Sequence, residues 1–116
     1  LEAARTAALP LLPGAATASE AMLLLELGFD TLKFFPAESA GGVSALKAMA
    51  GPLPQIIWCP TGGIDAAKAA AYLALPSVLC VGGSWIVPTE ALAQKNWQRI
   101  RDLARSAAAV GSAQTT

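Results

Sequence analysis

The stretch Thr31-Leu-Lys-Phe-Phe-Pro-Ala-Glu-Ser39 predicts a short buried strand that carries one cation. Its apolar residues give the near-continuous run of a parallel strand covered on both faces: Leu32, Phe34 and Phe35. Pro36 ends the strand, because proline cannot donate to a sheet ladder. Side chains alternate along a strand, so Lys33 is expected to share a face with Phe35 and to point away from Leu32.

A lysine in an apolar strand has two interpretations. An amine that has lost its proton can attack a carbonyl carbon and form a Schiff base. Alternatively, Lys33 lies near the strand end, with its stem along apolar surface and its ammonium group in water. The rest of the chain bears on this choice.

The length and composition indicate at most one domain of ordinary size. The chain has 116 residues, of which 54% are hydrophobic and 14% charged, and its formal net charge is +0. A typical soluble domain has about 25% charged residues, so we expect either a well-buried core or apolar surface that a partner covers. The eight Lys and Arg residues are scattered, which argues against nucleic acid or a membrane surface as partner.

The cysteine and histidine content limits which redox and metal sites the chain can form. Cys59 and Cys80 each fall within a predicted strand and are expected to be buried free thiols of a cytoplasmic protein. No metal is expected, because the chain has no histidine and no cysteine pair at ligand spacing. The most apolar stretch, residues 69–81, is broken by Pro76 and is too short to span a bilayer. No signal peptide is recognisable.

Strand and helix signals alternate along the chain. Strands are predicted at residues 9–12, 31–35, 55–59 and 77–81. Thr17 with Glu20 has capping-box spacing, so a helix is expected from there to Leu27 with Met22, Leu23 and Leu27 on its apolar face. Further helices are predicted at residues 43–49, at 66–73 behind an Asp65 cap, at 89–93 and at 96–109, the last with Ile100, Leu103 and Ala107 on one face.

This repeated strand–helix order predicts a parallel sheet with right-handed crossovers. A doubly wound sheet and a (β/α)₈ barrel both fit. The barrel is favoured because every strand is followed by a Pro or Gly loop, at the side where barrel enzymes build their sites. Four strands make half of such a barrel. We assign residues 1–110 to this half-barrel and residues 111–116 to a frayed tail.

Two glycine-rich loops are candidates for an anion site. Thr61-Gly62-Gly63 and Gly82-Gly83-Ser84 follow successive strands. Glycines let backbone N–H groups approach an anion closely, and a following helix N-terminus favours negative charge. Ser84 adds a hydroxyl donor. The alternative is that each Gly-Gly only makes a tight turn.

Other side chains are candidates by position. Thr61 shares a strand face with Cys59 and Ile57, so it is expected at the barrel mouth near Lys33, where it can hydrogen-bond substrate or merely cap the strand. Phe35 is expected to wall the pocket. Glu38 is interpreted as a solvated or helix-capping carboxylate, with contact to the site as the alternative. Trp58 and Trp85 are expected in the core or an interface.

Four motifs together resemble the KDPG/KHG aldolases, which act on 2-dehydro-3-deoxy-6-phosphogluconate. They are Leu-Pro-Gly at 12–14, Lys-Phe-Phe-Pro-Ala-Glu at 33–38, Cys-Pro-Thr-Gly-Gly-Ile at 59–64 and Val-Gly-Gly-Ser-Trp at 81–85. The resemblance implies that Lys33 is the Schiff-base lysine, that Phe35 and Thr61 contact substrate, and that Gly62, Gly63, Gly83 and Ser84 hold its phosphate. It also implies a cytoplasmic, cofactor-free and metal-independent (β/α)₈ barrel of the Entner–Doudoroff pathway that assembles as a trimer.

The resemblance covers only the C-terminal half of that barrel. The family's acid/base glutamate and the arginine and threonine that bind the pyruvate carboxylate belong to the earlier half, so no residue here inherits those roles. Three alternatives remain: an aldolase for 4-hydroxy-2-oxoglutarate, which lacks a phosphate; a non-catalytic phosphate-binding module; and an inactive half-barrel that dimerises.

Overall fold

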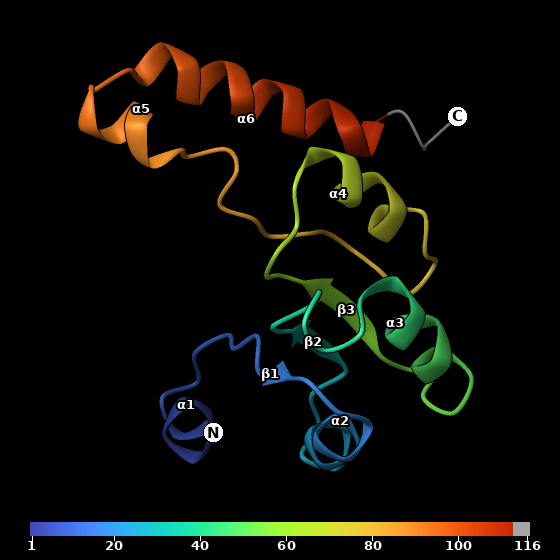
Figure 1. Ribbon diagram of the computed structural model, residues 1–116. Helices are drawn as coiled ribbons and strands as arrows, with labels where there is room; N and C mark the ends of the chain where they lie inside the picture. Colours follow the sequence, from blue (N-terminus) through green and yellow to red (C-terminus); the bar gives the residue numbers. More distant parts are fainter. Residues whose placement is uncertain (113–116) are drawn as a thin grey trace.

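The computed structural model describes residues 1–112, and its ribbon is drawn in Figure 1. Three strands run through the middle of the chain: β1 (Gly14–Ala15), β2 (Thr31–Phe34) and β3 (Ile57–Pro60). Along residues 1–112, six helices lie before, between and after these strands: α1 (Glu2–Thr6), α2 (Ala18–Glu26), α3 (Gly42–Ala50), α4 (Ala66–Leu73), α5 (Thr89–Ala93) and α6 (Trp97–Ser112). The expected α/β order of elements is therefore confirmed.

The strands form one parallel sheet in the order β1-β2-β3. The expected strand around Lys33 is thus the central one, and Lys33 lies in register with Gly14 on one side and Cys59 on the other. Leu32 and Phe34 are fully buried, while Lys33 is half-buried on the opposite face. The predicted alternation of faces along β2 is confirmed.

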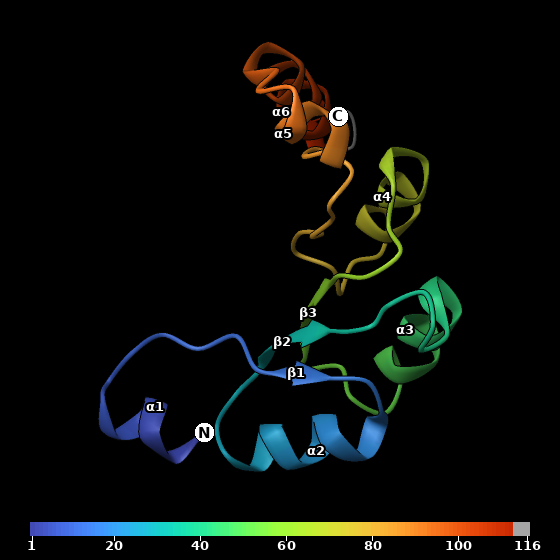
Figure 2. The ribbon, with the colours of Figure 1, turned by 60° about the vertical axis from the view of Figure 1, so that its left-hand side comes forward.

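Helices cover only one face of this sheet. Figure 2 shows α2 below the strands, α3 to their right and α4 above and to the right, while α1 lies to the left, apart from the strands. Buried residues of β2 and β3 point toward α2, α3 and α4, and Phe34 packs edge-on against Trp58 with ring centroids 5.7 Å apart. The expectation that the β2 strand is covered on both faces is wrong for this chain. One-sided helix cover is the arrangement of a barrel segment and not of a doubly wound sheet.

The strand predicted at residues 9–12 does not form. Leu9, Leu11 and Leu12 are exposed, and the ladder begins with the carbonyl of Pro13, which accepts from the Lys33 N–H at 2.8 Å. Pro10 and Pro13 lack the N–H groups that a ladder needs, so the strand starts only at Gly14.

The strand predicted at residues 77–81 is reduced to two isolated bridges. Trp58 pairs with Val78 and Thr61 pairs with Gly82. Between these bridges the 78–82 segment has one more residue than β3, and an extra residue interrupts a ladder in the way a bulge does. The segment still follows β3, since the Leu79 N–H donates to Trp58 at 3.0 Å and the Gly82 N–H to Pro60 at 2.9 Å.

The predicted helix boundaries hold well. The Thr17 hydroxyl accepts from the Glu20 N–H at 3.2 Å and donates to the Glu20 carboxylate at 2.8 Å, so the capping box is formed. Asp65 caps α4 by accepting from the Lys68 N–H at 2.9 Å. Gly28 follows α2 with a φ of 90°, as expected for a C′ glycine.

The apolar face predicted for α2 is wrong. The helix buries Ala21 and Leu24, whereas Met22, Leu23 and Leu27 are exposed. The helix has four consecutive large apolar residues, Met22 to Leu25, so it offers an apolar residue in almost every direction. The sheet therefore decides which face is buried, and the sequence period does not.

The last two helices lie away from the sheet. In Figure 1, α5 and α6 lie beyond α4, and α6 contacts α4. The least exposed positions of α6 recur at helical spacing and include the three expected ones: Ile100, Leu103, Ala107 and Val110. Gly111 and Ser112 still belong to α6, so the tail expected from Gly111 is helical at its start. Its remainder, residues 113–116, lies outside the described residues.

The molecule is more open than a complete domain of its size. Its radius of gyration is 15.7 Å, against about 13 Å for a compact domain of this length. Its accessible surface is 7102 Å², against about 5,900 Å² for a compact monomer of this mass. Both differences agree with a barrel segment whose inner face is uncovered.

Candidate active site

Lys33 lies in the middle of the open sheet face. Its Nζ atom is 4.9 Å from the centroid of the Phe35 ring, so the two side chains meet on the face that the alternation predicted. Strands lie in register on both sides of Lys33, which places its backbone inside the sheet and not at a frayed end. Within residues 1–112, no carboxylate forms an ion pair with this amine. The amine is therefore available to a ligand on the open face.

A pocket of about 480 Å³ lies at the carboxyl ends of β2 and β3. The structure brings six of the seven predicted site residues together around it, and the seventh, Lys33, reaches its wall through the Phe35 ring. The lining residues are Phe35, Thr61, Gly62, Gly63, Ile64, Gly83 and Ser84. Sequence reasoning missed Ile64 as a lining residue, although it directly follows the first glycine pair.

Close packing fixes the first glycine loop. Gly62 and Gly63 have φ values of 110° and 73°, which side chains rarely adopt. A Cβ atom at Gly63 would also lie 2.9 Å from the Glu38 side chain. The loop is tied to the end of β2, because the Ala37 N–H donates to the Thr61 carbonyl at 2.8 Å and the Glu38 N–H to the Gly62 carbonyl at 3.2 Å. The tight-turn interpretation is thus part of the explanation for these glycines.

Backbone donors remain for a ligand in this pocket. Within the described residues, no acceptor takes the N–H groups of Gly62, Gly63, Gly83 or Ser84. Backbone N–H groups in glycine loops are the usual way a protein holds a phosphate. The helix contribution is weaker than the sequence suggested, because Asp65 already caps α4 and the segment after Ser84 is irregular up to α5.

Side-chain contacts pack the Gly82-Gly83-Ser84 loop against the Thr61-Gly62-Gly63 loop. A Cβ atom at Gly83 would overlap the Trp85 ring, and one at Gly82 would lie 2.6 Å from the Thr61 hydroxyl. Thr61 therefore packs on Gly82 while it lines the pocket. Trp85 packs partly buried against the core, and Trp58 is fully buried, which agrees with the expectation for both tryptophans.

Glu38 does not line the pocket, but its side chain lies against Gly63, behind the loop that does line it. Its carboxylate accepts from the Tyr72 hydroxyl at 2.7 Å and pairs with Lys68 at 3.2 Å. Lys68 also donates to the Gly63 carbonyl at 3.3 Å. The Tyr72 hydrogen bond, followed by that from Lys68, lowers the pKa of Glu38, while burial and then the Glu38 hydrogen bond raise the pKa of Tyr72. Sequence reasoning missed Lys68 and Tyr72, although their spacing of four residues on one helix puts them on one face.

Both cysteines are free thiols, as predicted, but they are less buried than expected. Cys59 is half-buried and Cys80 is exposed. Burial, followed by the hydrogen bond between the Cys59 and Cys80 thiols, raises the pKa of Cys59 to about 11. Within residues 1–112, no group of three or more His, Cys, Asp or Glu side chains is arranged to hold a metal ion. None of the helices in that part of the chain is long and apolar enough to cross a membrane.

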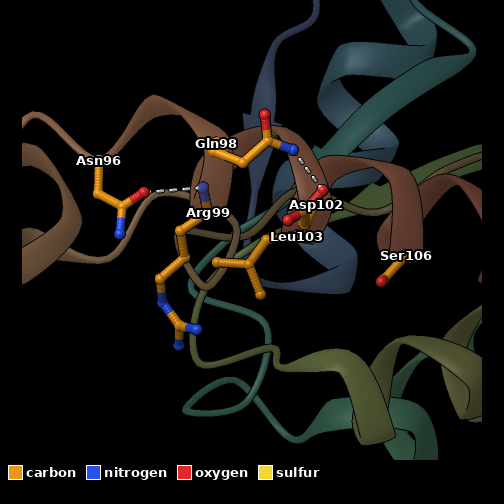
Figure 3. Close-up of a pocket in the computed structure, with 6 residues that line it drawn as sticks. All are labelled: Asn96, Gln98, Arg99, Asp102, Leu103 and Ser106. Carbon is orange, nitrogen blue, oxygen red and sulfur yellow. Dashed lines mark hydrogen bonds between the residues drawn. The ribbon is translucent and has the colours of Figure 1, made fainter.

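A second pocket, of about 390 Å³, lies on the surface of α6 and the turn before it, and is drawn in Figure 3. Two of its side chains pair with each other, since Gln98 donates to Asp102 at 2.9 Å, and the Asn96 side chain accepts from the backbone N–H of Arg99 at 3.1 Å. It carries none of the predicted site residues and lies away from the strand ends. We therefore place the candidate active site at the Lys33 pocket.

A parallel barrel segment with a lysine on its inner face and a glycine-lined pocket at its strand ends defines a piece of a (β/α)₈-barrel enzyme. Comparison with known proteins makes this specific: the family model described as "KDPG and KHG aldolase" matches residues 1–103. The chain belongs to the KDPG/KHG aldolase family.

Relatives in the family are similar along most of the chain. A KHG/KDPG aldolase of Escherichia coli K12 is 54% identical over 107 residues, which are 92% of this chain and 50% of the relative. A 2-dehydro-3-deoxy-phosphogluconate aldolase of Dickeya dadantii is 53% identical over 113 residues, or 97% of this chain and 53% of the relative. The chain thus spans about half the length of the curated relatives it matches.

Solved structures give the same result. The KDPG aldolase of Legionella pneumophila, with pyruvate captured as a covalent carbinolamine, matches with a TM-score of 0.80 and 53% identity over 82% of this chain and 46% of that one. The Zymomonas mobilis enzyme with 3-phosphoglycerate matches with a TM-score of 0.81 and 49% identity, over 90% of this chain and 48% of that one. The α/β half-barrel inferred from the sequence is confirmed.

Proposed function

We propose that this chain supplies the imine-forming half of a class I aldolase that cleaves 2-dehydro-3-deoxy-6-phosphogluconate to pyruvate and glyceraldehyde 3-phosphate. One observation carries the proposal: the Lys33 amine lies against the Phe35 wall of a pocket that the two glycine loops line. The relatives with pyruvate as a carbinolamine and with 3-phosphoglycerate support the two ligand chemistries, an imine-forming oxo acid and a phosphate ester.

Lys33 would act as the nucleophile. Its neutral amine attacks the 2-oxo carbon of the substrate, and loss of water leaves an iminium ion. The iminium withdraws electrons, so the C3–C4 bond breaks and glyceraldehyde 3-phosphate leaves. The remaining enamine is protonated at carbon, and water hydrolyses the iminium to release pyruvate and restore the amine.

The other pocket residues would bind and orient the substrate. The N–H groups of Gly62, Gly63, Gly83 and Ser84 are proposed to hold the phosphate, with the Ser84 hydroxyl as a further donor. The Phe35 ring lies next to both Gly62 and the Lys33 amine, and Thr61 lines the same pocket, so a substrate chain reaching the amine would contact them. The proton transfers need an acid/base group, which the resemblance assigns to the half of the barrel that this chain lacks.

A second substrate has support from the relatives' names. The Escherichia coli relative is called a KHG/KDPG aldolase, so 4-hydroxy-2-oxoglutarate is the alternative substrate for the same lysine. The glycine loops favour the phosphorylated substrate. We further propose a cytoplasmic location and a homo-oligomer, a trimer in the complete enzyme, in line with the family resemblance.

Trapping with pyruvate and borohydride tests the role of Lys33. Reduction of the imine should add one pyruvate-derived group to the chain and block trypsin at Lys33, so that residues 6–47 appear as one peptide. Lys33→Arg should abolish the adduct, because a guanidinium group stays protonated. Lys47→Arg is the matched control, since Lys47 is exposed on α3, and it should leave trapping unchanged. An adduct on Lys47, Lys68 or Lys95 in the unaltered chain would remove Lys33 from the proposed role.

A further inference from the structure

The two cysteines of the chain meet on the open face of the sheet. The Cys80 thiol donates a hydrogen bond to the Cys59 sulfur, with the two sulfur atoms 3.3 Å apart. Cys59 lies in β3, in register with Lys33, and Cys80 lies in the 78–82 segment that follows β3. The proposed aldolase chemistry uses neither thiol.

The backbone around these thiols is already close to what a disulfide needs. Bridges lie on both sides of the pair, at Trp58–Val78 and at Thr61–Gly82. Neighbouring strands lie about 4.7–4.9 Å apart, within the Cα separation of about 4.4–6.8 Å that disulfides span. A disulfide has sulfur atoms about 2.05 Å apart, so side-chain rotation that closes a little over 1 Å would form the bond.

We propose that Cys59 and Cys80 are an oxidation site, which a peroxide converts into an intrachain disulfide. The Cys80 sulfur first attacks the peroxide, which forms a Cys80 sulfenic acid and releases one water. The Cys59 sulfur then attacks the Cys80 sulfur; the S–S bond forms, the S–O bond breaks and a second water leaves. In total two thiols lose two electrons and two protons, and one hydrogen peroxide becomes two waters.

Exposure sets the order of these steps. Cys80 is exposed and reachable by the oxidant, whereas Cys59 is half-buried. The raised pKa of Cys59 keeps it protonated, and a thiol is a poorer nucleophile than a thiolate. Cys80 is therefore the thiol that reacts first. Cys59 resolves it despite its raised pKa, because the two sulfur atoms already lie 3.3 Å apart.

The bond would fasten a weakly attached part of the fold. Within the described part of the chain, only two isolated bridges pair the 78–82 segment with β3 and its end, and this segment leads directly into the Gly83–Ser84 loop of the pocket. A disulfide to Cys59 closes the chain between β3 and this segment, and such closures typically raise the melting temperature of a small domain by on the order of 10 °C.

Peptide mapping of the oxidised chain tests the site independently of aldolase function. The purified chain is treated with one equivalent of hydrogen peroxide, alkylated with iodoacetamide and digested with trypsin without reduction. Peptides 48–68 and 69–95, which hold Cys59 and Cys80, should appear linked, with a mass lower by two hydrogen atoms than their sum. The melting temperature should rise and should return on treatment with dithiothreitol.

Two variants test the order of reaction. In Cys59→Ala the Cys80 sulfenic acid has no resolving thiol, so dimedone should label Cys80. In Cys80→Ala, dimedone should leave Cys59 unlabelled. Full alkylation of both cysteines after peroxide, a Cys80–Cys80 link between two chains, or dimedone labelling of Cys59 would overturn the proposal, and a linked pair with an unchanged melting temperature would overturn its stabilising role.

Discussion

Single residues behind the pocket determine how much the conformation of the Gly62–Gly63 loop contributes to the stability of the fold. Gly63 has a φ of 73°, and a Cβ atom there would press on Glu38. We expect Gly63→Ala to lower the free energy of unfolding by about 1–3 kcal/mol, because it combines a left-handed backbone with a steric conflict. Urea denaturation would measure this change.

Gly111→Ala is the matched control for that substitution. Gly111 lies at an exposed position of α6, and a Cβ atom there meets no other atom within 4 Å. Alanine at such a site should leave stability unchanged or raise it by about 0.4–1 kcal/mol. Equal losses for the two variants would mean that the Gly63 conformation is not what the structure describes.

The Glu38–Tyr72–Lys68 cluster should make stability depend on acid pH. Because the folded chain lowers the pKa of Glu38, this carboxylate stabilises the fold above its unfolded pKa of about 4.5. The contribution is lost as the pH falls through the still lower folded value. Glu38→Gln should therefore flatten the stability profile below about pH 5, as urea midpoints measured from pH 7 to 3 would show. A variant profile parallel to that of the unaltered chain would contradict this assignment.

For single residues, the position of Lys33 was predictable from the sequence, whereas the contact of Glu38 with Tyr72 behind the Gly63 loop was not. A cation in an apolar strand is visible in the sequence, and alternation places it beside Phe35. The partnership of Glu38 with Tyr72 joins residues 34 positions apart, and only the packing of α4 against the β2 loop brings them together.

Among the elements, the helix caps are the most local features and the easiest to test. Thr17→Ala removes the acceptor for the Glu20 N–H and should cost about 1 kcal/mol of stability. Ser19→Ala, at an exposed position in the first turn of the same helix, should change little. Thermal or urea unfolding compares the two, and a similar loss for both would show that the cap contributes nothing specific.

The two glycine loops should act as one anion site. Gly83→Val would place its side chain against the Trp85 ring and disturb the loop, so 3-phosphoglycerate should bind at least tenfold more weakly by calorimetry. Trapping of pyruvate on Lys33 should fall much less, because pyruvate has no phosphate. Equal losses for the two ligands would contradict the assignment of this loop to phosphate.

Sequence reasoning succeeded where elements depend on local chemistry and failed where they depend on distant pairing. Caps, glycine helix ends and the α3, α4 and α5 boundaries follow from neighbouring residues. The strands expected at residues 9–12 and 77–81 needed partners across the sheet, and prolines in the first and an extra residue in the second prevented a ladder. The buried face of α2 was predicted wrongly for the same reason, because contact with the sheet determines which face of the helix is buried.

For the whole molecule, the uncovered sheet face is the dominant feature. Thr31, Lys33, Ile57 and Cys59 lie on this face partly exposed, where a closed barrel would pack layers of side chains. Exposed apolar side chains lie around it at Phe35, Leu79 and Leu12. Each large apolar side chain left in water forgoes about 1.5–3 kcal/mol, which in sum is comparable with the 5–15 kcal/mol stability of a domain.

We therefore expect the purified 116-residue chain to self-associate, with a second copy covering the open face. Sedimentation velocity at several concentrations should show a dimer or larger species that grows with concentration. A single monomeric species across that range would show that the open face is stable in water.

The claim that the chain is half of an aldolase is tested most directly by its turnover. A coupled assay for pyruvate release from 2-dehydro-3-deoxy-6-phosphogluconate would compare this chain with the full-length Dickeya dadantii relative under the same conditions. Because the resemblance assigns the acid/base group to the other half of the barrel, the chain alone should be slower by at least about 10²–10⁴-fold, while Lys33 still traps pyruvate. A monomeric chain that releases pyruvate at the rate of the full-length relative would contradict the account.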